Sequence, residues 1–302
     1  MNQKIIVVCG PTASGKTQFA HQFALKNNGE IVNADSMQIY QQIPIITASP
    51  EDNLKKELPY HLYNFRSVEK DFSAIKYINL ASSTIKEIIS RGKLPIITGG
   101  TGMYIDMLIN GYNQVPDVDV EVRKKVRRLH AEIGQERFFT ALSALDPQVT
   151  QIIKSNDVQR SLRAYEVLQS TGKSILYFQN QPKNRPFEGF EFESYFLRPK
   201  REFLYKTCNE RFCQIFENGA VEEVARLKKQ YPNLQTSATK ALGIKEISDY
   251  LDGKITKKEA VDGASMQTRR YAKRQCTWFN NQLDSPYIIE FENKAEYISK
   301  LK

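Results

Sequence analysis

Short apolar runs alternate with helical patterns in the first third of the chain. One run gives a predicted strand at residues 4–9, and similar runs cover residues 30–34 and 94–98. Between the first two, residues 16–26 place apolar side chains on one helical face. Uninterrupted apolar runs of this length are typical of buried strands. The alternation therefore predicts an α/β fold with a parallel sheet, whose ligands bind beyond the carboxyl ends of the strands.

The pattern changes after Asp117. Helical periodicity continues without a strand pattern at residues 121–134, 135–145, 147–154 and 157–170. A linker with two prolines follows at residues 179–187. A strand pattern at residues 190–197, a helix from Lys200 and a long helix from Thr256 to about Gln282 complete the series.

Charge separates the middle of the chain from the rest. Residues 121–185 contain 12 Lys or Arg against 6 Asp or Glu, so they supply +6 of the formal net charge of +9. We therefore predict a basic, mostly helical insertion at residues 117–185. The two flanking parts, residues 1–116 and 186–302, are predicted to form one catalytic core.

The segment GPTASGKT follows the first predicted strand and opens the first predicted helix. It meets the phosphate-loop pattern in full, with Gly10, Gly15, Lys16 and Thr17 at the required positions. Backbone N–H groups of such a loop cradle phosphate oxygens, the lysine neutralises them, and the Thr17 hydroxyl is suited to bind Mg²⁺. This context makes a chance glycine-rich turn a poor explanation.

An acidic residue that ATP-hydrolysing proteins need is missing from the strand at residues 94–98, which ends on Gly99 and Gly100. An ordinary ATPase is therefore disfavoured. A kinase remains possible, because its metal-binding acid can come from another strand, and Asp35 follows such a strand. The residues alone predict phosphate or pyrophosphate binding and leave the chemistry open.

Two further turns follow predicted strands. Asp35-Ser36-Met37-Gln38 offers a carboxylate that could accept a proton and an amide that could bind an adenine edge. A turn in which Asp35 caps its neighbours explains the same residues equally well. The turn around Thr101 could bring backbone amides or a hydroxyl to a ligand, or it could serve close packing.

A row of cations and aromatic side chains runs from Arg269 to Phe279. It could bind phosphates and stack bases, but a solvated charged face above an apolar stripe explains it as well. The same two explanations apply to the basic residues at 123–128.

Composition limits the class of protein. With 302 residues, 41% hydrophobic and 25% charged, the chain is expected to be a folded enzyme-sized protein. No apolar run approaches the ~20 residues of a membrane span, and the N-terminal run is too short for a signal peptide, so we expect a cytoplasmic protein. The four cysteines lack the spacing of a zinc site or a disulfide framework. The positive charge suits RNA or a membrane surface.

Several motifs together resemble the tRNA dimethylallyltransferase family, also called tRNA isopentenyltransferase. They are GPTASGKT, NADSMQIY, PIITGGTGMYI, SNDVQRSLRAYEVLQSTG, ERFCQIFENGAVEEV, ALGIKE and TRRYAKRQCTWF, in the family's order. The resemblance covers residues 5 to about 282. We expect the bacterial or organellar form to be the closer match, because this sequence shows no C-terminal zinc finger of the kind that eukaryotic members can carry.

The resemblance implies an activity. The family transfers a dimethylallyl group from its diphosphate to N6 of the adenosine 3′-adjacent to the anticodon and releases pyrophosphate. Its fold is similar to that of P-loop kinases, and its helical insertion holds the anticodon stem-loop. The implied partners are tRNA, dimethylallyl diphosphate and Mg²⁺, with no membrane and no obligate protein partner. A monomer is the default expectation.

The resemblance also assigns roles by position. Asp35 is the implied general base, Lys16 and Thr17 bind the diphosphate and Mg²⁺, and Arg211 stabilises the leaving group. The diphosphate loop comprises Gly10, Pro11, Thr12, Ala13, Ser14, Gly15, Lys16 and Thr17. Implied tRNA contacts are Asp35, Ser36, Met37, Gln38, Thr101, Arg123, Gln159, Arg160, Ser161, Leu162, Arg163, Lys240 and Lys245.

Two departures weaken parts of this pattern. Residues 42–50 keep Thr47, Ala48 and Pro50 but lack the Gly, Asp and Lys usual in the family, and Ile244 stands where tyrosine is common. The alternatives are a small-molecule or nucleotide kinase and a non-catalytic RNA-binding module. The intact Lys16, Thr17, Asp35 and Arg211 argue against the second.

Overall fold

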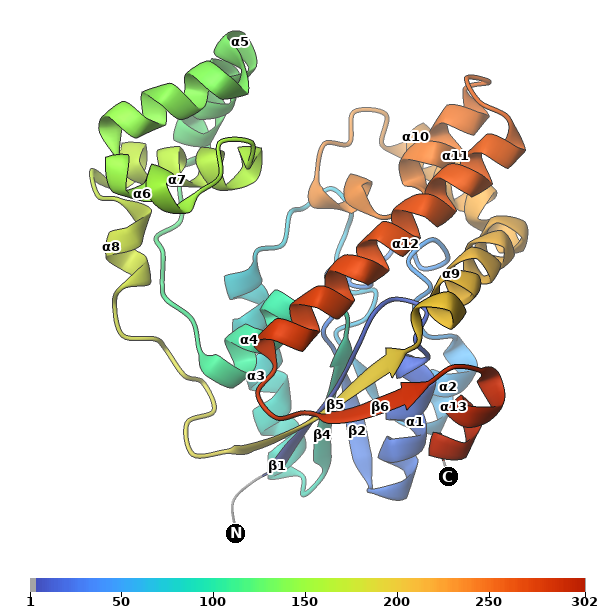
Figure 1. Ribbon diagram of the computed structural model, residues 1–302. Coiled ribbons are helices and arrows are strands. Elements are labelled where there is room, and N and C mark those ends of the chain that lie inside the picture. The colour runs from blue at the N-terminus through green and yellow to red at the C-terminus, as the bar shows by residue number, and fades with distance from the viewer. Residues whose placement is uncertain (1–3, 302) are drawn as a thin grey trace. The chain divides into compact units, whose positions relative to one another are not determined.

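Six parallel strands form the central sheet of the computed structural model, which describes residues 4–301 (Figure 1). The strand order is β3-β2-β4-β1-β5-β6. Each neighbouring pair is parallel. The strands are β1 Lys4–Cys9, β2 Gly29–Asn33, β3 Tyr60–His61, β4 Leu94–Gly99, β5 Glu191–Pro199 and β6 Tyr287–Phe291.

Helices cover both faces of this sheet, as Figure 1 shows. Helix α1 packs against β1, β2 and β4 on one face, where α13 lies beside it, while α3 contacts β2, β4 and helix α4. The α-helices of this unit are α1 Lys16–Lys26, α2 Asp52–Glu57, α3 Ala74–Ser90, α4 Gly102–Asn110, α9 Arg201–Ile215, α10 Val221–Gln230, α11 Ile244–Leu251, α12 Lys257–Gln282 and α13 Lys294–Leu301. A π-turn, Phe216–Ala220, joins α9 to α10.

The sheet core follows from burial on both faces. In β1, the residues Ile5 to Cys9 are all buried. Ile6 and Val8 pack with Phe19 and Ala24 of α1, so alternate residues of the strand face α1. A strand covered on both sides is a continuous apolar run, which is why the sequence pattern locates it so well.

The chain divides into two compact units. The larger comprises residues 1–110 and 187–302, and the smaller comprises residues 111–186. The smaller unit contains α5 Val120–Leu145, α6 Pro147–Ile152, α7 Val158–Thr171 and α8 Ile175–Gln179. Its core includes Leu142, Val149, Ala164 and Val167.

Helix caps fix the boundaries in the smaller unit. The side chains of Asp119, Asp146 and Asp157 accept hydrogen bonds from backbone N–H groups of the first turns of α5, α6 and α7. Such caps satisfy donors that have no partner within the helix. Gly134, at φ 74°, breaks α5 into the two helical segments that the pattern predicted.

Most of the elements expected from the sequence are present. Those at residues 4–9, 16–26 and 94–98, and the long C-terminal helix, match β1, α1, β4 and α12 within one residue. The prediction that the helix ending near Gln282 is the last element was wrong, because β6 and α13 follow it. Strand β6 is mostly exposed and lacks the continuous apolar run that marks the inner strands. In the part of the chain that the structure describes, no helix is both long and apolar enough to cross a bilayer.

Gly99 permits two strand ends to meet without a side chain between them. A Cβ at this position would lie 2.2 Å from the carbonyl carbon of Ala34. We predict that Gly99→Ala lowers the free energy of unfolding by about 1–3 kcal/mol, because the atoms that the new Cβ would meet belong to the backbone of Ala34 and cannot move aside easily.

The matched control is Gly263→Ala in α12, where a Cβ would lie 3.4 Å from the flexible Glu246 side chain. We expect it to stabilise by about 0.5–1 kcal/mol through helix propensity. Denaturant unfolding of the two variants measures both effects, and a Gly99→Ala protein as stable as the control would contradict this packing argument.

Candidate active site

The phosphate loop has the left-handed backbone that its sequence requires. Gly10, Ala13 and Gly15 have φ values of 149°, 63° and 82°. A Cβ on Gly10 would lie 2.6 Å from the carbonyl oxygen of Leu197, and one on Gly15 would lie 2.6 Å from the ring of Tyr297. The Tyr297 hydroxyl donates to the Gly15 carbonyl oxygen at 2.8 Å. The loop therefore turns tightly into α1 and directs the start of that helix toward a cavity.

Some of the loop's groups are used within the protein. The Thr12 N–H donates to Oε1 of Gln275 at 2.8 Å, and the Ser14 N–H donates to the Pro11 carbonyl at 3.3 Å. The Lys16 ammonium donates to the same Pro11 carbonyl at 2.6 Å. The Thr12 and Ser14 amides, which the motif offers to a phosphate, are thus engaged in the loop's own geometry.

Asp35 lies in a tightly bonded turn after β2. The Asn33 carboxamide accepts from the Asp35 N–H at 2.8 Å and donates to the Asp35 carbonyl at 3.0 Å. Oδ1 of Asp35 accepts from the Met37 N–H at 2.9 Å. The capping role that the sequence left open is therefore present, and the second carboxylate oxygen has no such bond to the turn.

Thr101 joins this turn to the end of β4. Its Oγ1 accepts from the Ser36 N–H at 2.9 Å and donates to Oγ of Ser36 at 3.2 Å. The Thr101 N–H donates to the Ala34 carbonyl at 3.1 Å. The strand ends of β2 and β4 are therefore bonded to each other where their turns begin.

Residues 43–50 form a loop that is held by two distant side chains. The Gln38 amide nitrogen donates to the carbonyls of Thr47 and Ala48 at 3.1 and 3.0 Å. Glu223 of α10, only 3% exposed, accepts from the N–H groups of Ile45 and Ile46 at 2.9 and 2.8 Å. Burial raises the pKa of Glu223, and these two bonds oppose that shift. The sequence did not predict this role for Glu223, although Glu223 lies in the ERFCQIFENGAVEEV motif.

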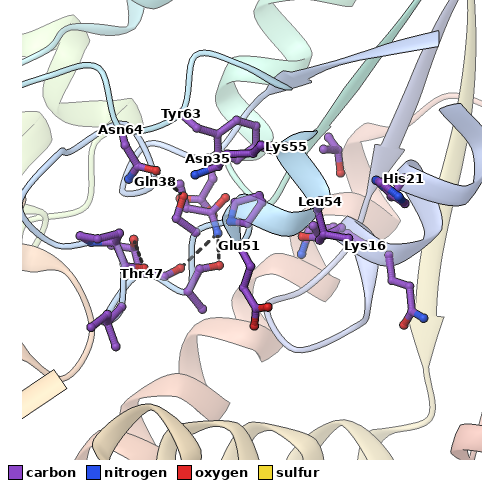
Figure 2. Close-up of a pocket in the computed structure, with 18 of the residues that line it drawn as sticks. Lys16, His21, Asp35, Gln38, Thr47, Glu51, Leu54, Lys55, Tyr63 and Asn64 are labelled. Carbon is purple, nitrogen blue, oxygen red and sulfur yellow. Dashed lines mark hydrogen bonds between the residues drawn. The ribbon is translucent and has the colours of Figure 1, made fainter. Parts of the chain in front are cut away.

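Two cavities open onto this group of loops. The larger cavity, of about 1230 Å³, is lined by residues of the phosphate loop, by Gln38 and by the 43–50 loop. Figure 2 shows part of this lining. The smaller, of about 330 Å³, is lined by Met37 and by residues of α9 and α12. The side chains that line both cavities are those of Thr12, Asp35, Thr47, Arg211 and Ile215. Asp35 and Arg211 therefore stand where the cavities adjoin.

Charge is concentrated at this junction. Burial lowers the pKa of Lys16 to about 8, an effect that the Asp35 carboxylate opposes and the Arg211 guanidinium increases. Burial also lowers the pKa of Arg211, and Asp35 opposes that shift as well. Two cations and one carboxylate share the site, so a bound anion would relieve their mutual repulsion.

The smaller cavity brings in residues from the C-terminal half of the chain. Lys240, Thr268, Tyr271 and Arg274 line it. The Arg274 guanidinium lies 5.6 Å from the centroid of the Tyr271 ring. On α12, Ala272, Gln275 and Phe279 are buried while Lys273 and Arg274 are exposed. Helix α12 therefore has both features that the sequence suggested. One side is a buried stripe, and the charged side reaches the smaller cavity.

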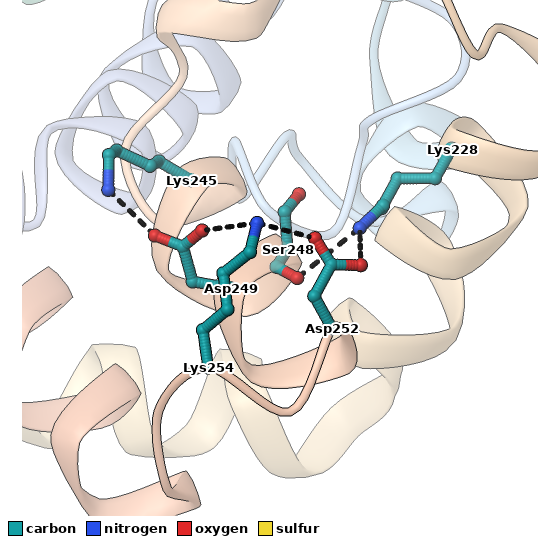
Figure 3. A network of polar contacts seen from close by, with 6 residues as sticks. All are labelled: Lys228, Lys245, Ser248, Asp249, Asp252 and Lys254. Carbon is teal, nitrogen blue, oxygen red and sulfur yellow. Dashed lines mark hydrogen bonds and ion pairs between the residues drawn. The ribbon is translucent and has the colours of Figure 1, made fainter.

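Lys245 belongs to a surface network, which Figure 3 shows. Its ammonium lies 2.7 Å from Asp249, which also contacts Lys254, and Lys254 pairs with Asp252. Lys245 lines neither cavity. Its expected contact with RNA would therefore have to be made at the exposed surface of α11.

The remaining predicted contacts lie in the smaller unit. Buried Glu166 is 3.9 Å from Nε of Arg123 and 3.5 Å from Nε of Arg127. Arg163 donates to the Pro116 carbonyl at 3.1 Å, and Arg160 is exposed beside Asp157.

Ser161 differs from its neighbours in the predicted RNA-contacting stretch. Its side chain is fully buried, with 0% exposure, and its hydroxyl donates to the Asp157 carbonyl at 2.8 Å. Ser161 therefore stabilises the first turn of α7 from inside the unit. Gln159 and Arg160 are exposed, so their side chains are accessible to a ligand.

The oxygen donors of the larger cavity suit Mg²⁺. The Thr17 hydroxyl and the Asp35 carboxylate line the same cavity. Among residues 4–301, no group of three or more His, Cys, Asp or Glu side chains is placed to hold a metal. Mg²⁺ is usually bound by one or two protein oxygens together with substrate phosphates and water, and the Thr17 hydroxyl could supply one such oxygen.

Comparison with known sequences identifies relatives over nearly the whole chain. A model of the IPP transferase family matches residues 38–282. The tRNA dimethylallyltransferase of Rickettsia massiliae is 51% identical over 300 residues, which cover 99% of this chain and 83% of that protein. The tRNA dimethylallyltransferase of Rickettsia felis is 51% identical, with 98% and 96% covered.

Solved structures agree. The full-length tRNA isopentenylpyrophosphate transferase of Bacillus halodurans is 30% identical, with a TM-score of 0.67, and the alignment covers 100% of this chain and 94% of that one. A eukaryotic dimethylallyltransferase acting on tRNA is 26% identical, with a TM-score of 0.81 and coverage of 98% and 75%. The predicted fold class and the predicted family resemblance are both confirmed: this chain belongs to the IPP transferase family of tRNA dimethylallyltransferases.

Proposed function

We propose that the chain transfers the dimethylallyl group of dimethylallyl diphosphate to N6 of the adenosine 3′-adjacent to the anticodon of tRNA. The observation that carries this assignment is the position of Asp35 and Arg211 on the wall shared by the two cavities. One cavity holds the phosphate loop, and the other reaches the basic side chains of α12. A diphosphate and a nucleobase would approach Asp35 from different sides.

The acceptor needs a base because the lone pair of the exocyclic amine is delocalised into the adenine ring. N6 attacks C1 of the dimethylallyl group while the bond from C1 to the diphosphate oxygen breaks. The electron pair of that bond leaves with pyrophosphate, and the N6 proton passes to the Asp35 carboxylate. The bond between Asp35 Oδ1 and the Met37 N–H fixes the direction of the carboxylate.

The leaving group gains charge as the bond breaks. Lys16 and Arg211 line the larger cavity and supply two positive charges to it. In a partly desolvated site such charges stabilise the transition state more than they would in water. The Thr17 hydroxyl would hold Mg²⁺ together with diphosphate oxygens, and the bound ion would neutralise part of that charge.

The flipped base is proposed to enter the smaller cavity. Removing it from a single-stranded loop costs little stacking energy. Met37 and the Tyr271 ring offer surfaces on which a base could stack, and Lys240 and Arg274 could bind the adjacent phosphates. The Gln38 amide nitrogen is occupied by the 43–50 loop, so its contact with adenine would have to use Oε1.

We assign the residues at 117–185 to the anticodon stem-loop. Their positive charge and the exposed Gln159 and Arg160 support that role. The buried Glu166 carboxylate lies within ion-pair distance of Arg123 and Arg127, which reduces the repulsion between these two cations. A location in the cytoplasm and a monomeric state stay predictions.

One incubation tests the function. Unmodified tRNA with adenosines beside its anticodon, dimethylallyl diphosphate and Mg²⁺ should yield prenylated adenosine and an equal amount of pyrophosphate. A kinase would instead turn over ATP, and a non-catalytic module would bind tRNA unchanged. Failure to form either product would overturn the proposal.

Replacing the proposed base should slow chemistry without loosening the RNA. Asp35→Asn keeps an oxygen for the Met37 N–H but removes the proton acceptor. We expect kcat to fall about 10²–10⁴-fold with tRNA affinity nearly unchanged. Single-turnover kinetics and filter binding measure the two quantities, and loss of tRNA affinity would instead assign Asp35 to RNA positioning.

The pKa of Lys16 predicts how diphosphate binding depends on pH. Below pH 8 the free protein carries the ammonium, and its attraction for the ligand is fully present. Above that pKa the proton must be taken up on binding, so affinity should fall by up to about tenfold per pH unit. Calorimetric titration with dimethylallyl diphosphate between about pH 7 and pH 9.5 tests this in a range where phosphate, with a second pKa of about 6, is already ionised.

Lys16→Arg is the control, because a guanidinium keeps its charge over this range. It should flatten the pH dependence even where its affinity is lower. An equal slope in both proteins would assign the titration to another group.

The exposed arginine of the smaller unit gives a test of RNA binding. The Arg160 side chain is 75% exposed, and its Nε lies 3.4 Å from the Asp157 carboxylate. Arg160→Ala should weaken tRNA binding and reduce the slope of log affinity against log salt by about one. Lys86→Ala, at an exposed position of α3, is the control and should leave the slope unchanged.

A further inference from the structure

Gln275 is a buried polar side chain whose two ends bind different loops. It is 5% exposed and lies on α12. Its Oε1 accepts from the Thr12 N–H at 2.8 Å, and its Nε2 donates to the Gly100 carbonyl at 2.8 Å. Each partner is a backbone group, so the contact fixes main-chain positions.

The two loops joined by Gln275 serve opposite sides of the proposed reaction. Thr12 belongs to the phosphate loop and lines both cavities. Gly100 precedes Thr101, whose hydroxyl is bonded to the backbone of Ser36 at 2.9 Å. Ser36 follows Asp35 directly. Hydrogen bonds and short stretches of backbone therefore connect the phosphate loop, through Gln275, to the turn that carries Asp35.

The backbone of Gly100 lies so close to Gln275 that there is no room for a side chain at position 100. A Cβ at Gly100 would lie 2.2 Å from Nε2 of Gln275. The Thr12 N–H, which a phosphate loop could otherwise offer to its ligand, is given to Gln275 instead. A loop amide is thus used for alignment.

We propose that Gln275 is a positioning residue that holds the leaving-group loop and the acceptor turn at a fixed separation. The inference rests on the proposed prenyl transfer. Gln275 acts through Thr12, Gly100 and Thr101. Since misplacement by about 1 Å can cost about 10²-fold in rate, loss of this bridge should lower kcat by about 10- to 100-fold.

Two substitutions at the position separate alignment from mere packing. Gln275→Met has a similar length but neither polar group, so both backbone partners lose their bonds. Gln275→Glu keeps an acceptor for the Thr12 N–H. When ionised, its second oxygen would face the Gly100 carbonyl oxygen and repel it; when protonated, it would donate to that oxygen as the amide does.

The expected signature is recovery at low pH. The ratio of kcat for Gln275→Glu to that of the wild type should rise at least about fivefold between about pH 8.5 and pH 6, because burial keeps the introduced carboxyl protonated at higher pH than usual. The same ratio for Gln275→Met should stay low and flat. The neighbouring ionisable groups are present in all these proteins, and Gln275→Met shows the pH dependence that they contribute without a carboxyl at position 275. They are Lys16, Asp35, Arg211, Tyr271, Arg274 and Cys276.

A second variant reaches the contact from the other side. Gly100→Ala would displace the Gln275 amide and should lower kcat as Gln275→Met does. Combining both changes should cost little more than either alone, since the bridge is already broken. Thr277→Ala, on the exposed side of the same helix, is the matched control and should retain wild-type kcat.

The outcomes decide between the two proposals. Kinetics at saturating tRNA and dimethylallyl diphosphate are measured below the unfolding temperature of each variant. Wild-type kcat in Gln275→Met, or parallel pH ratios for Gln275→Met and Gln275→Glu, would overturn the role of Gln275 while the proposed function stands. An inactive wild-type protein would overturn the proposed function and this inference with it.

Discussion

The site depends on the close approach of backbones at the carboxyl edge of the sheet. The turns after β1, β2 and β4 converge because parallel strands end at the same edge. Gly10, Gly99 and Gly100 allow that approach, since a Cβ on each would lie within 2.6 Å of another residue's atoms. Without these contacts, Lys16 and Asp35 would not face one cavity.

Polar side chains from the second half of the chain hold these turns in place. Glu223 binds the 43–50 loop, Gln275 binds the phosphate loop, and the Tyr297 hydroxyl binds Gly15. Each satisfies backbone groups that would be costly to leave unpaired when buried. Gln38 and Glu223 together fix the backbone of the 43–50 loop.

Charge then decides what the site can do. Where the two cavities meet, Lys16 and Arg211 outnumber Asp35, whereas Glu51, Asp52 and Glu57 line another part of the larger cavity. An anion whose charge increases during reaction is therefore favoured beside Lys16 and Arg211. A prenyl diphosphate meets that condition without any transfer of a γ-phosphate. The missing carboxylate at the end of β4 is consistent with this chemistry, because a metal held for ATP hydrolysis is not required.

The sequence alone predicted the strands of the inner sheet, the phosphate loop, the basic helical segment and the family resemblance. These depend on local patterns: continuous apolar runs, glycine spacing and charge. It did not locate β6 and α13, which lack a strong local pattern, nor the roles of Glu223 and Gln275. Asp35 and Arg211 are 176 positions apart, and the folded structure was needed to show that they share one wall between two cavities. Such contacts depend on how the chain returns to the sheet edge, and no local pattern encodes them.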